Sequence, residues 1–247
     1  MSLDLSALHD EIPKAVRHFW KARNRAAKSQ KTRGVSDQGN RAGVTAGKNM
    51  DGFVAAIRRI IVDNGLDKDS VHCLGRTDVT LPGFYRATKN WDLLVVNRGQ
   101  LIAAIEFKSQ VGPSFGNNFN NRVEEALGNA TDLLTAFREG VFAESPKPFL
   151  GYFFVLEECE KSTTPVAIRC PHFQAMPEFE QASYVERYEI FCRKLVQEQL
   201  YDAAALLLTD QTSAKTGEIG QASAMTSHER FAAVLAGKVA ASSAENV

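Results

Sequence analysis

The sequence lacks most of the features that identify large protein classes at once. Its 247 residues include only four cysteines, Cys73, Cys159, Cys170 and Cys192. Without a Cys-x-x-Cys pair, these predict reduced thiols rather than a zinc site or a disulfide framework. No apolar run approaches the length of about 18 residues that a membrane span needs, and the N-terminus shows no basic stretch followed by an apolar one. We therefore expect no membrane span, no signal peptide and a cytoplasmic location.

Nucleotide-binding signatures are absent as well. The chain has no GxxxxGK[ST] loop, no Rossmann glycine fingerprint and no internal repeat. This excludes an ordinary ATP-driven function. The composition, 44% hydrophobic and 23% charged, is that of a globular protein long enough to bury a sizeable core.

Net charge is also lacking, but the positive charge is concentrated near one end. Between positions 14 and 48, a single acid, Asp37, stands among ten basic residues: Lys14, Arg17, Lys21, Arg23, Arg25, Lys28, Lys31, Arg33, Arg41 and Lys48. Such a cluster predicts a contact with a polyanion, although a solvated basic helix face is the common alternative. Repeated Gly, Ser, Gln and Asn from 29 to 49 favour a flexible arm.

Two short apolar runs form the centre of the chain. Leu93 to Val96 and Leu101 to Phe107 flank the turn-like tetrapeptide Asn97-Arg98-Gly99-Gln100. Their Val and Ile content, with the central glycine, predicts a β-hairpin buried on both faces.

Three charges interrupt the outer end of this hairpin: Asp92, Glu106 and Lys108. In an antiparallel pair the two outer ends lie side by side, so these residues should meet. Unpaired buried charge is unfavourable, and a divalent metal would explain two converging carboxylates. The alternative is a salt bridge of Lys108 with Glu106 or Asp92.

The remaining periodicity predicts a mixed α/β fold, with a central sheet flanked by helices, an N-terminal helical and basic arm, and C-terminal helices. Expected helices cover 4–28 (with a possible break at Pro13), 49–63, 122–138, 185–200 and 228–239, and expected strands cover 71–74, 78–81 and 149–156, before a disordered tail over 240–247. We expect a single domain over 1–247, which consists of the arm (1–48), an α/β core (49–160) and a mostly helical part (161–247).

A polar segment, 109–121, follows the second apolar run and predicts a loop. Asn and Gln can pair with an adenine edge and Arg with guanine, which makes these side chains candidates for base recognition. They are Gln110, Asn117, Asn118, Asn120 and Arg122. Asparagines are equally common in loops without any such role. Arg33, Arg41 and Lys48 are the candidates for phosphate contacts.

The pattern Asp-x(13)-Glu-x-Lys resembles the active-site signature of the PD-(D/E)xK nuclease superfamily. Acid-x-Lys occurs once, where chance gives about 1.5 occurrences, so the hairpin context carries the resemblance. It implies a restriction-endonuclease-like fold in which Asp92, Glu106 and the Phe107 carbonyl hold Mg²⁺ and Lys108 acts on the attacking water. Asp51 resembles an extra acid, usually Glu, on the preceding helix. A favourable interaction with the helix dipole explains Asp51 equally well.

The centre Trp-Asp…Ile-Glu-Phe-Lys-Ser-Gln and the segment Arg41 to Phe53 further resemble the XhoI family of type II restriction endonucleases. Trp91 stands where the superfamily usually has Pro. The resemblance implies a homodimer that cuts double-stranded DNA at CTCGAG after the first C, leaving four-base 5′ overhangs. It also implies a cognate methyltransferase that acts on the same site. Two alternatives remain open: a repair or junction-resolving nuclease of the same superfamily, and a non-catalytic DNA-binding protein.

Overall fold

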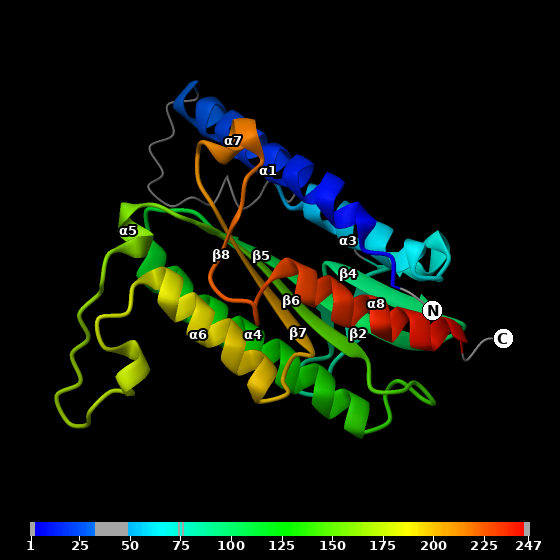
Figure 1. Ribbon diagram of the computed structural model, residues 1–247. Helices are drawn as coiled ribbons and strands as arrows, with labels where there is room; N and C mark the ends of the chain where they lie inside the picture. Colours follow the sequence, from blue (N-terminus) through cyan, green and yellow to red (C-terminus); the bar gives the residue numbers. More distant parts are fainter. Residues whose placement is uncertain (1–2, 33–48, 74, 76, 245–247) are drawn as a thin grey trace.

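The computed structural model describes residues 3–32, 49–73, 75 and 77–244, and a six-stranded mixed sheet forms its centre (Figure 1). In spatial order the strands are β1 (Val71–His72), β4 (Leu93–Asn97), β5 (Gln100–Gln110), β6 (Phe149–Glu157), β7 (Ala203–Thr209) and β8 (Gly220–Gln221). The three central strands, β5, β6 and β7, are parallel, and all outer pairings are antiparallel. A separate two-stranded sheet pairs β2 (Thr80–Pro82) with β3 (Thr88–Asn90).

Helices cover both faces of the sheet (Figure 1). One face packs against α1 (Ser6–Thr32), α3 (Asp51–Asp63) and α8 (His228–Ala244), and the other against α4 (Phe115–Arg138) and α6 (Tyr184–Gln197). The short helices are η2 (Lys68–Ser70), α5 (Glu160–Thr163), η3 (Pro177–Phe179) and α7 (Ser213–Thr216). Each face buries its own apolar cluster, so β5, β6 and β7 are apolar on both sides. The predicted mixed α/β fold with a flanked central sheet is confirmed.

The central hairpin is present as predicted. Arg98 and Gly99 have φ angles of 50° and 80°, the left-handed pair that a tight two-residue hairpin turn requires. β5 then runs for 11 residues, and all of its positions from Leu101 to Phe107 are buried. The hairpin therefore fixes the position of its charged outer end relative to the central sheet.

The loop predicted over 109–121 is wrong for its second half, because α4 begins at Phe115. That ring is buried and stacks on Tyr184, with ring centroids 5.7 Å apart. Phe119, four residues later, packs edge-to-face against Tyr188 at 5.0 Å. The apolar stripe of the helix thus extends about two turns further back than the asparagines suggest.

Three other segments differ from the expectations. β7 has no predicted counterpart, since its sequence Ala-Ala-Ala-Leu-Leu-Leu-Thr is completely buried and shows no alternation. The tail predicted as disordered from 240 is helical to Ala244. Helix α1 continues through Pro13, where the buried neighbours Ile12 and Val16 hold it against the core.

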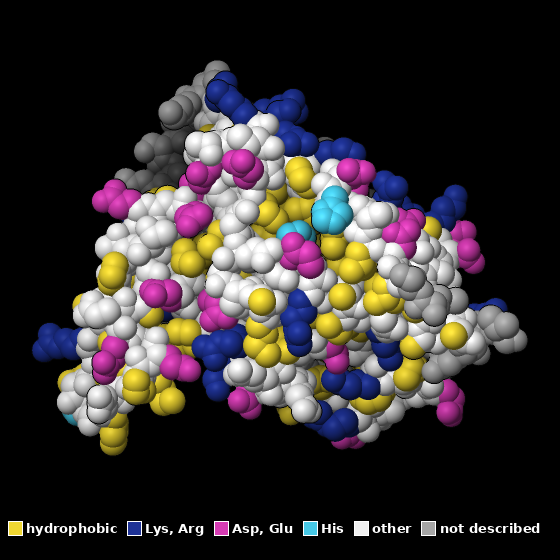
Figure 2. Space-filling view, in the orientation of Figure 1, with side chains coloured by type: hydrophobic (Ala, Val, Ile, Leu, Met, Phe, Trp, Pro, Cys, Tyr) yellow, Lys and Arg dark blue, Asp and Glu magenta, His cyan; other side chains and the backbone are white. Residues whose placement is uncertain are grey.

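The basic cluster lies partly on α1. Figure 2 shows a row of Lys and Arg side chains along the upper edge of the molecule, over α1 and α3. Lys14, Lys21 and Lys28 of α1 are exposed. Arg33, Arg41 and Lys48 lie outside the described residues. Among the described helices, none combines the length and apolar character that crossing a membrane requires.

Candidate active site

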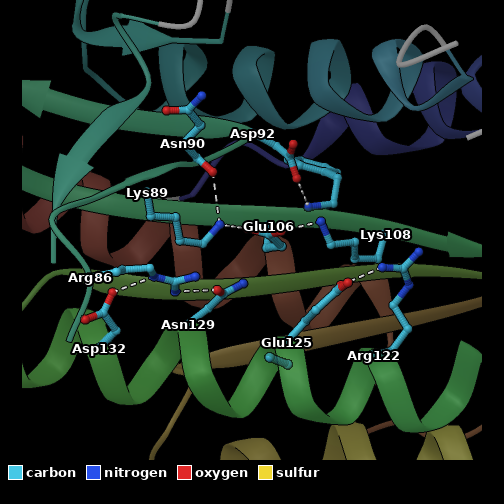
Figure 3. Close-up of polar contacts among 12 residues, drawn as sticks. Arg86, Lys89, Asn90, Asp92, Glu106, Lys108, Arg122, Glu125, Asn129 and Asp132 are labelled. Atoms are coloured by element: carbon cyan, nitrogen blue, oxygen red, sulfur yellow. Dashed lines mark hydrogen bonds and ion pairs between the residues drawn. The ribbon is translucent and has the colours of Figure 1, made fainter. Parts of the chain in front are cut away.

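The outer end of the β4–β5 hairpin brings the three predicted catalytic side chains together (Figure 3). Leu93 pairs with Ile105, which places the preceding residue, Asp92, beside Glu106. The Asp92 carboxylate accepts a hydrogen bond from the backbone N–H of Phe107, with Oδ2 2.7 Å from the nitrogen. This bond fixes the carboxylate at the edge of the sheet.

Glu106 is held between two lysines. Its Oε1 forms an ion pair with Lys108, and its Oε2 lies 2.7 Å from the Lys89 Nζ. The salt bridge between Lys108 and Glu106, which the sequence offers as the alternative to a metal site, is therefore present. The sequence does not identify Lys89 as a site residue, because its neighbours in the sequence form no motif. Only the position of β3 in the fold brings Lys89 to Glu106.

The charges of the site determine its protonation. Burial raises the pKa of the Asp92 carboxyl, and the negative charge of Glu106 raises it further. For Glu106, burial has the same effect, but the charges of Lys108 and Lys89 outweigh it, so the pKa is lowered. Burial opposes the charged form of Lys108, yet Glu106 and Asp92 outweigh burial and raise its pKa. Lys108 is consequently an ammonium group at neutral pH.

A cavity of about 500 Å³ opens beside the hairpin end. Among the residues that line it are the side chains of Asp51, Asp92, Lys108 and Arg122. Asp51 comes from the first turn of α3, and Arg122 from α4, so elements on both faces of the sheet contribute. The predicted extra acid thus faces the same space as Asp92.

The residues present fit Mg²⁺. No group of three or more His, Cys, Asp or Glu positioned to hold a metal occurs among the described residues. Mg²⁺ does not need one, since it takes oxygen ligands, keeps several waters and is usually held by one or two carboxylates. Asp92, Glu106 and the Phe107 carbonyl would supply such oxygens, and the cavity that Asp92 and Phe107 line has room for water.

The five residues proposed to contact bases lie in three different parts of the structure. Gln110 is buried, and its side-chain amide donates to the Val111 carbonyl. Asn117 and Asn120 are exposed on the first turns of α4, and Asn118 donates to the Ser114 carbonyl. Arg122 instead lines the cavity that Asp51 and Asp92 also line. It pairs with Glu125 at 2.5 Å, and its buried Nε has no hydrogen-bond partner among the described residues.

Glu106 itself lines a second opening, whereas Asp92 lines the first. The lining of the second opening also includes Arg86, Lys89, Lys108 and Asn129. Arg86 lies in the turn between β2 and β3, and its guanidinium donates to the Asn129 side chain at 2.7 Å. The β2–β3 turn therefore forms one wall of the site.

Comparisons with known proteins agree with this geometry. Residues 29–221 match the family model described as restriction endonuclease XhoI. The chain is 50% identical to the type II restriction enzyme XhoI of Xanthomonas vasicola, over 79% of this chain and 78% of the relative. It is 50% identical to the type II restriction enzyme BstVI of Geobacillus stearothermophilus, over 73% of this chain and 82% of that one.

A third relative, the type II restriction enzyme AbrI of Azospirillum brasilense, is 48% identical over 70% of this chain and 78% of its own length. No solved structure gives a significant match. The model match covers more than half of the chain, and each relative is aligned over more than two thirds of its length. The chain belongs to the XhoI family of type II restriction endonucleases.

Proposed function

We propose that the protein cuts both strands of DNA at a palindromic sequence in a reaction that requires Mg²⁺. The resemblance to the family gives CTCGAG as the sequence, cut after the first C with 5′ overhangs. The observation that carries the proposal is the convergence of Asp92, Glu106 and Lys108 at the outer end of the hairpin, where Asp92 and Lys108 line a cavity. Two carboxylates and an ammonium group in one place match the needs of phosphodiester hydrolysis.

The chain's own residues divide this chemistry. Asp92, Glu106 and the Phe107 carbonyl would hold the cation, and Asp51 lines the same cavity as Asp92. When bound, Mg²⁺ neutralises the scissile phosphate, lowers the pKa of a bound water and stabilises the leaving 3′-oxygen. Lys108, protonated and fixed by Glu106, donates hydrogen bonds to the attacking water and to a phosphate oxygen.

A palindrome and one active centre per chain favour a homodimer in which each subunit cuts one strand. The enzyme acts in the cytoplasm, where a cognate methyltransferase modifies the same site in the host's own DNA. Arg33, Arg41 and Lys48 bind phosphates, which gives affinity that falls with salt.

Incubation with plasmid DNA of known sequence tests the function. In Mg²⁺ we expect discrete fragments whose ends map to CTCGAG, and in chelator no cleavage. Nicking that follows DNA structure rather than sequence would favour a repair or junction-resolving nuclease. Binding without cleavage of any DNA in Mg²⁺ would favour a non-catalytic DNA-binding protein.

Asn117→Ala and Asn120→Ala test the assignment of base recognition to the start of α4. Because one two-bond contact to a base contributes about 1–3 kcal/mol of discrimination, each variant should cut near-cognate sites more readily relative to the cognate site. The measurement compares cleavage of the cognate duplex with duplexes changed at one base pair, at several salt concentrations. Gln197→Ala, on the exposed end of α6, serves as the control. A change only in the salt dependence of binding would identify phosphate contacts instead.

A further inference from the structure

The Glu106 carboxylate has a cation on each oxygen before any metal arrives. Lys108 pairs with Oε1, and the Nζ of Lys89 lies 2.7 Å from Oε2. The Lys89 side chain is only 11% exposed and that of Glu106 4%. Lys108 has a role in the proposed reaction, whereas the proposed function gives Lys89 none.

Lys89 is fixed in place by more than its ion pair. Its Nζ also donates to the Asn90 carbonyl at 3.0 Å and lies 4.4 Å from the centre of the Trp91 ring. The ring face attracts a cation, so Trp91 also stabilises the ammonium group. Trp91 is itself buried, and its backbone N–H donates to the Val79 carbonyl at 2.8 Å.

The strand that carries Lys89 is also held. β3 pairs with β2, and Figure 3 shows the turn between them tied to α4 by contacts of Arg86 with Asp132 and Asn129. Lys89 is thus a positive charge on a supported strand, aimed at the carboxylate that the proposed reaction needs for its metal.

We propose that Lys89 occupies a cation position of the active site in the metal-free protein, and that a divalent cation bound by Glu106 must displace or share it. The inference rests on the proposed function, because it takes Glu106 as a metal ligand. A doubly charged ion on the Glu106 carboxylate and an ammonium group 2.7 Å from Oε2 repel each other in a buried site. Lys89 is therefore a positioning residue: its ion pair holds the Glu106 carboxylate in place without metal, and it raises the metal concentration that loading requires.

Lys89→Met and Lys89→Gln test this role through metal binding itself. Calorimetric titration of the full chain with Ca²⁺, without DNA, gives the affinity directly. We expect both variants to bind Ca²⁺ about tenfold more tightly than the unaltered protein, because a competing charge has been removed. The glutamine variant keeps hydrogen-bond donors toward Glu106 and guards against a loss of folding. Lys147→Met, which removes a surface ion pair with Asp202, should leave the affinity unchanged.

Thermal unfolding supplies a second readout. Metal-free Lys89→Met should unfold at a lower temperature than the unaltered protein, because Glu106 loses one of its two partners. Saturating Ca²⁺ should then raise the midpoint more for the variant than for the unaltered protein, since tighter binding to the folded state stabilises it more.

The outcomes separate the two proposals. Ca²⁺ affinity in the Lys89 variants that is equal to or below that of the unaltered protein overturns the role of Lys89 and leaves the nuclease assignment intact. Absence of Ca²⁺ binding both in the unaltered protein and in the variants overturns the metal site, and the role of Lys89 with it.

Discussion

Asp92→Asn, Glu106→Gln and Lys108→Met should each reduce the rate of DNA cleavage by roughly a thousandfold or more, while the protein still binds its DNA. Removal of a single group that stabilises transition-state charge in a buried site has effects of about this size. In the proposed mechanism, the first two variants would remove a carboxylate oxygen from the metal, and the third would remove the ammonium group beside the attacking water. The measurement is single-turnover cleavage in Mg²⁺, with duplex binding in Ca²⁺ for comparison.

Two controls make this result specific. Glu106→Gln leaves Lys89 and Lys108 without a buried counter-charge, so thermal unfolding must first show that the variant is folded. Asp202→Asn and Lys147→Met alter a matched carboxylate and lysine in a surface ion pair and should cleave normally. Cleavage within severalfold of the unaltered rate in any of the three active-site variants would refute the site.

The β4–β5 hairpin could be predicted because its signals are local. Two apolar runs and a glycine turn predict an antiparallel pair, and the three charges at its outer ends should lie near one another. The exact register could not be predicted: counting back from the turn would pair Asp92 with Ile105, and a shift between Val95 and Val96 places Asp92 beside Glu106 instead.

Lys89 could not be predicted, because its contact with Glu106 spans 17 positions and depends on a second sheet. The sequence does not predict the start of α4, because the exposed side of its first turns is rich in asparagine. Its inner side, with Phe115 and Phe119, continues the apolar stripe of the helix. β7 was missed because a strand buried on both faces shows no alternation and its Ala and Leu residues do not favour a strand.

The wall of the site formed by the β2–β3 turn depends on one buried carboxylate. Asp132 of α4 is 4% exposed, and its Oδ1 accepts the backbone N–H groups of Phe84 at 2.8 Å and Tyr85 at 2.7 Å. Its Oδ2 accepts the Nε of Arg86 at 2.8 Å. Phe84 and Tyr85 themselves are 51% and 70% exposed, so apolar burial does not hold this turn.

Asp132→Ala should therefore lower the free energy of unfolding by about 2–4 kcal/mol, because it removes three hydrogen bonds and leaves partly buried donors without an acceptor. Asp202→Ala is the matched control. Asp202 accepts one backbone N–H and one lysine but is more exposed, so its loss should cost only about 1 kcal/mol. Urea unfolding at neutral pH measures both values. Equal effects of the two substitutions would mean that Asp132 does not hold the turn.

The effect of Asp132 should also depend on pH. Burial alone raises the pKa of this carboxyl, but hydrogen bonds from Arg86 and from the N–H groups of Tyr85 and Phe84 outweigh it and hold the pKa below its usual value. A lowered pKa in the folded state means that the contribution is present above the unfolded pKa of about 3.9 and is lost as the pH falls through the folded value. The difference in unfolding free energy between the unaltered protein and Asp132→Ala should thus be largest at neutral pH and shrink below about pH 4. A difference that stays constant from pH 7 to about pH 3 would show that the carboxylate charge is not what anchors the turn.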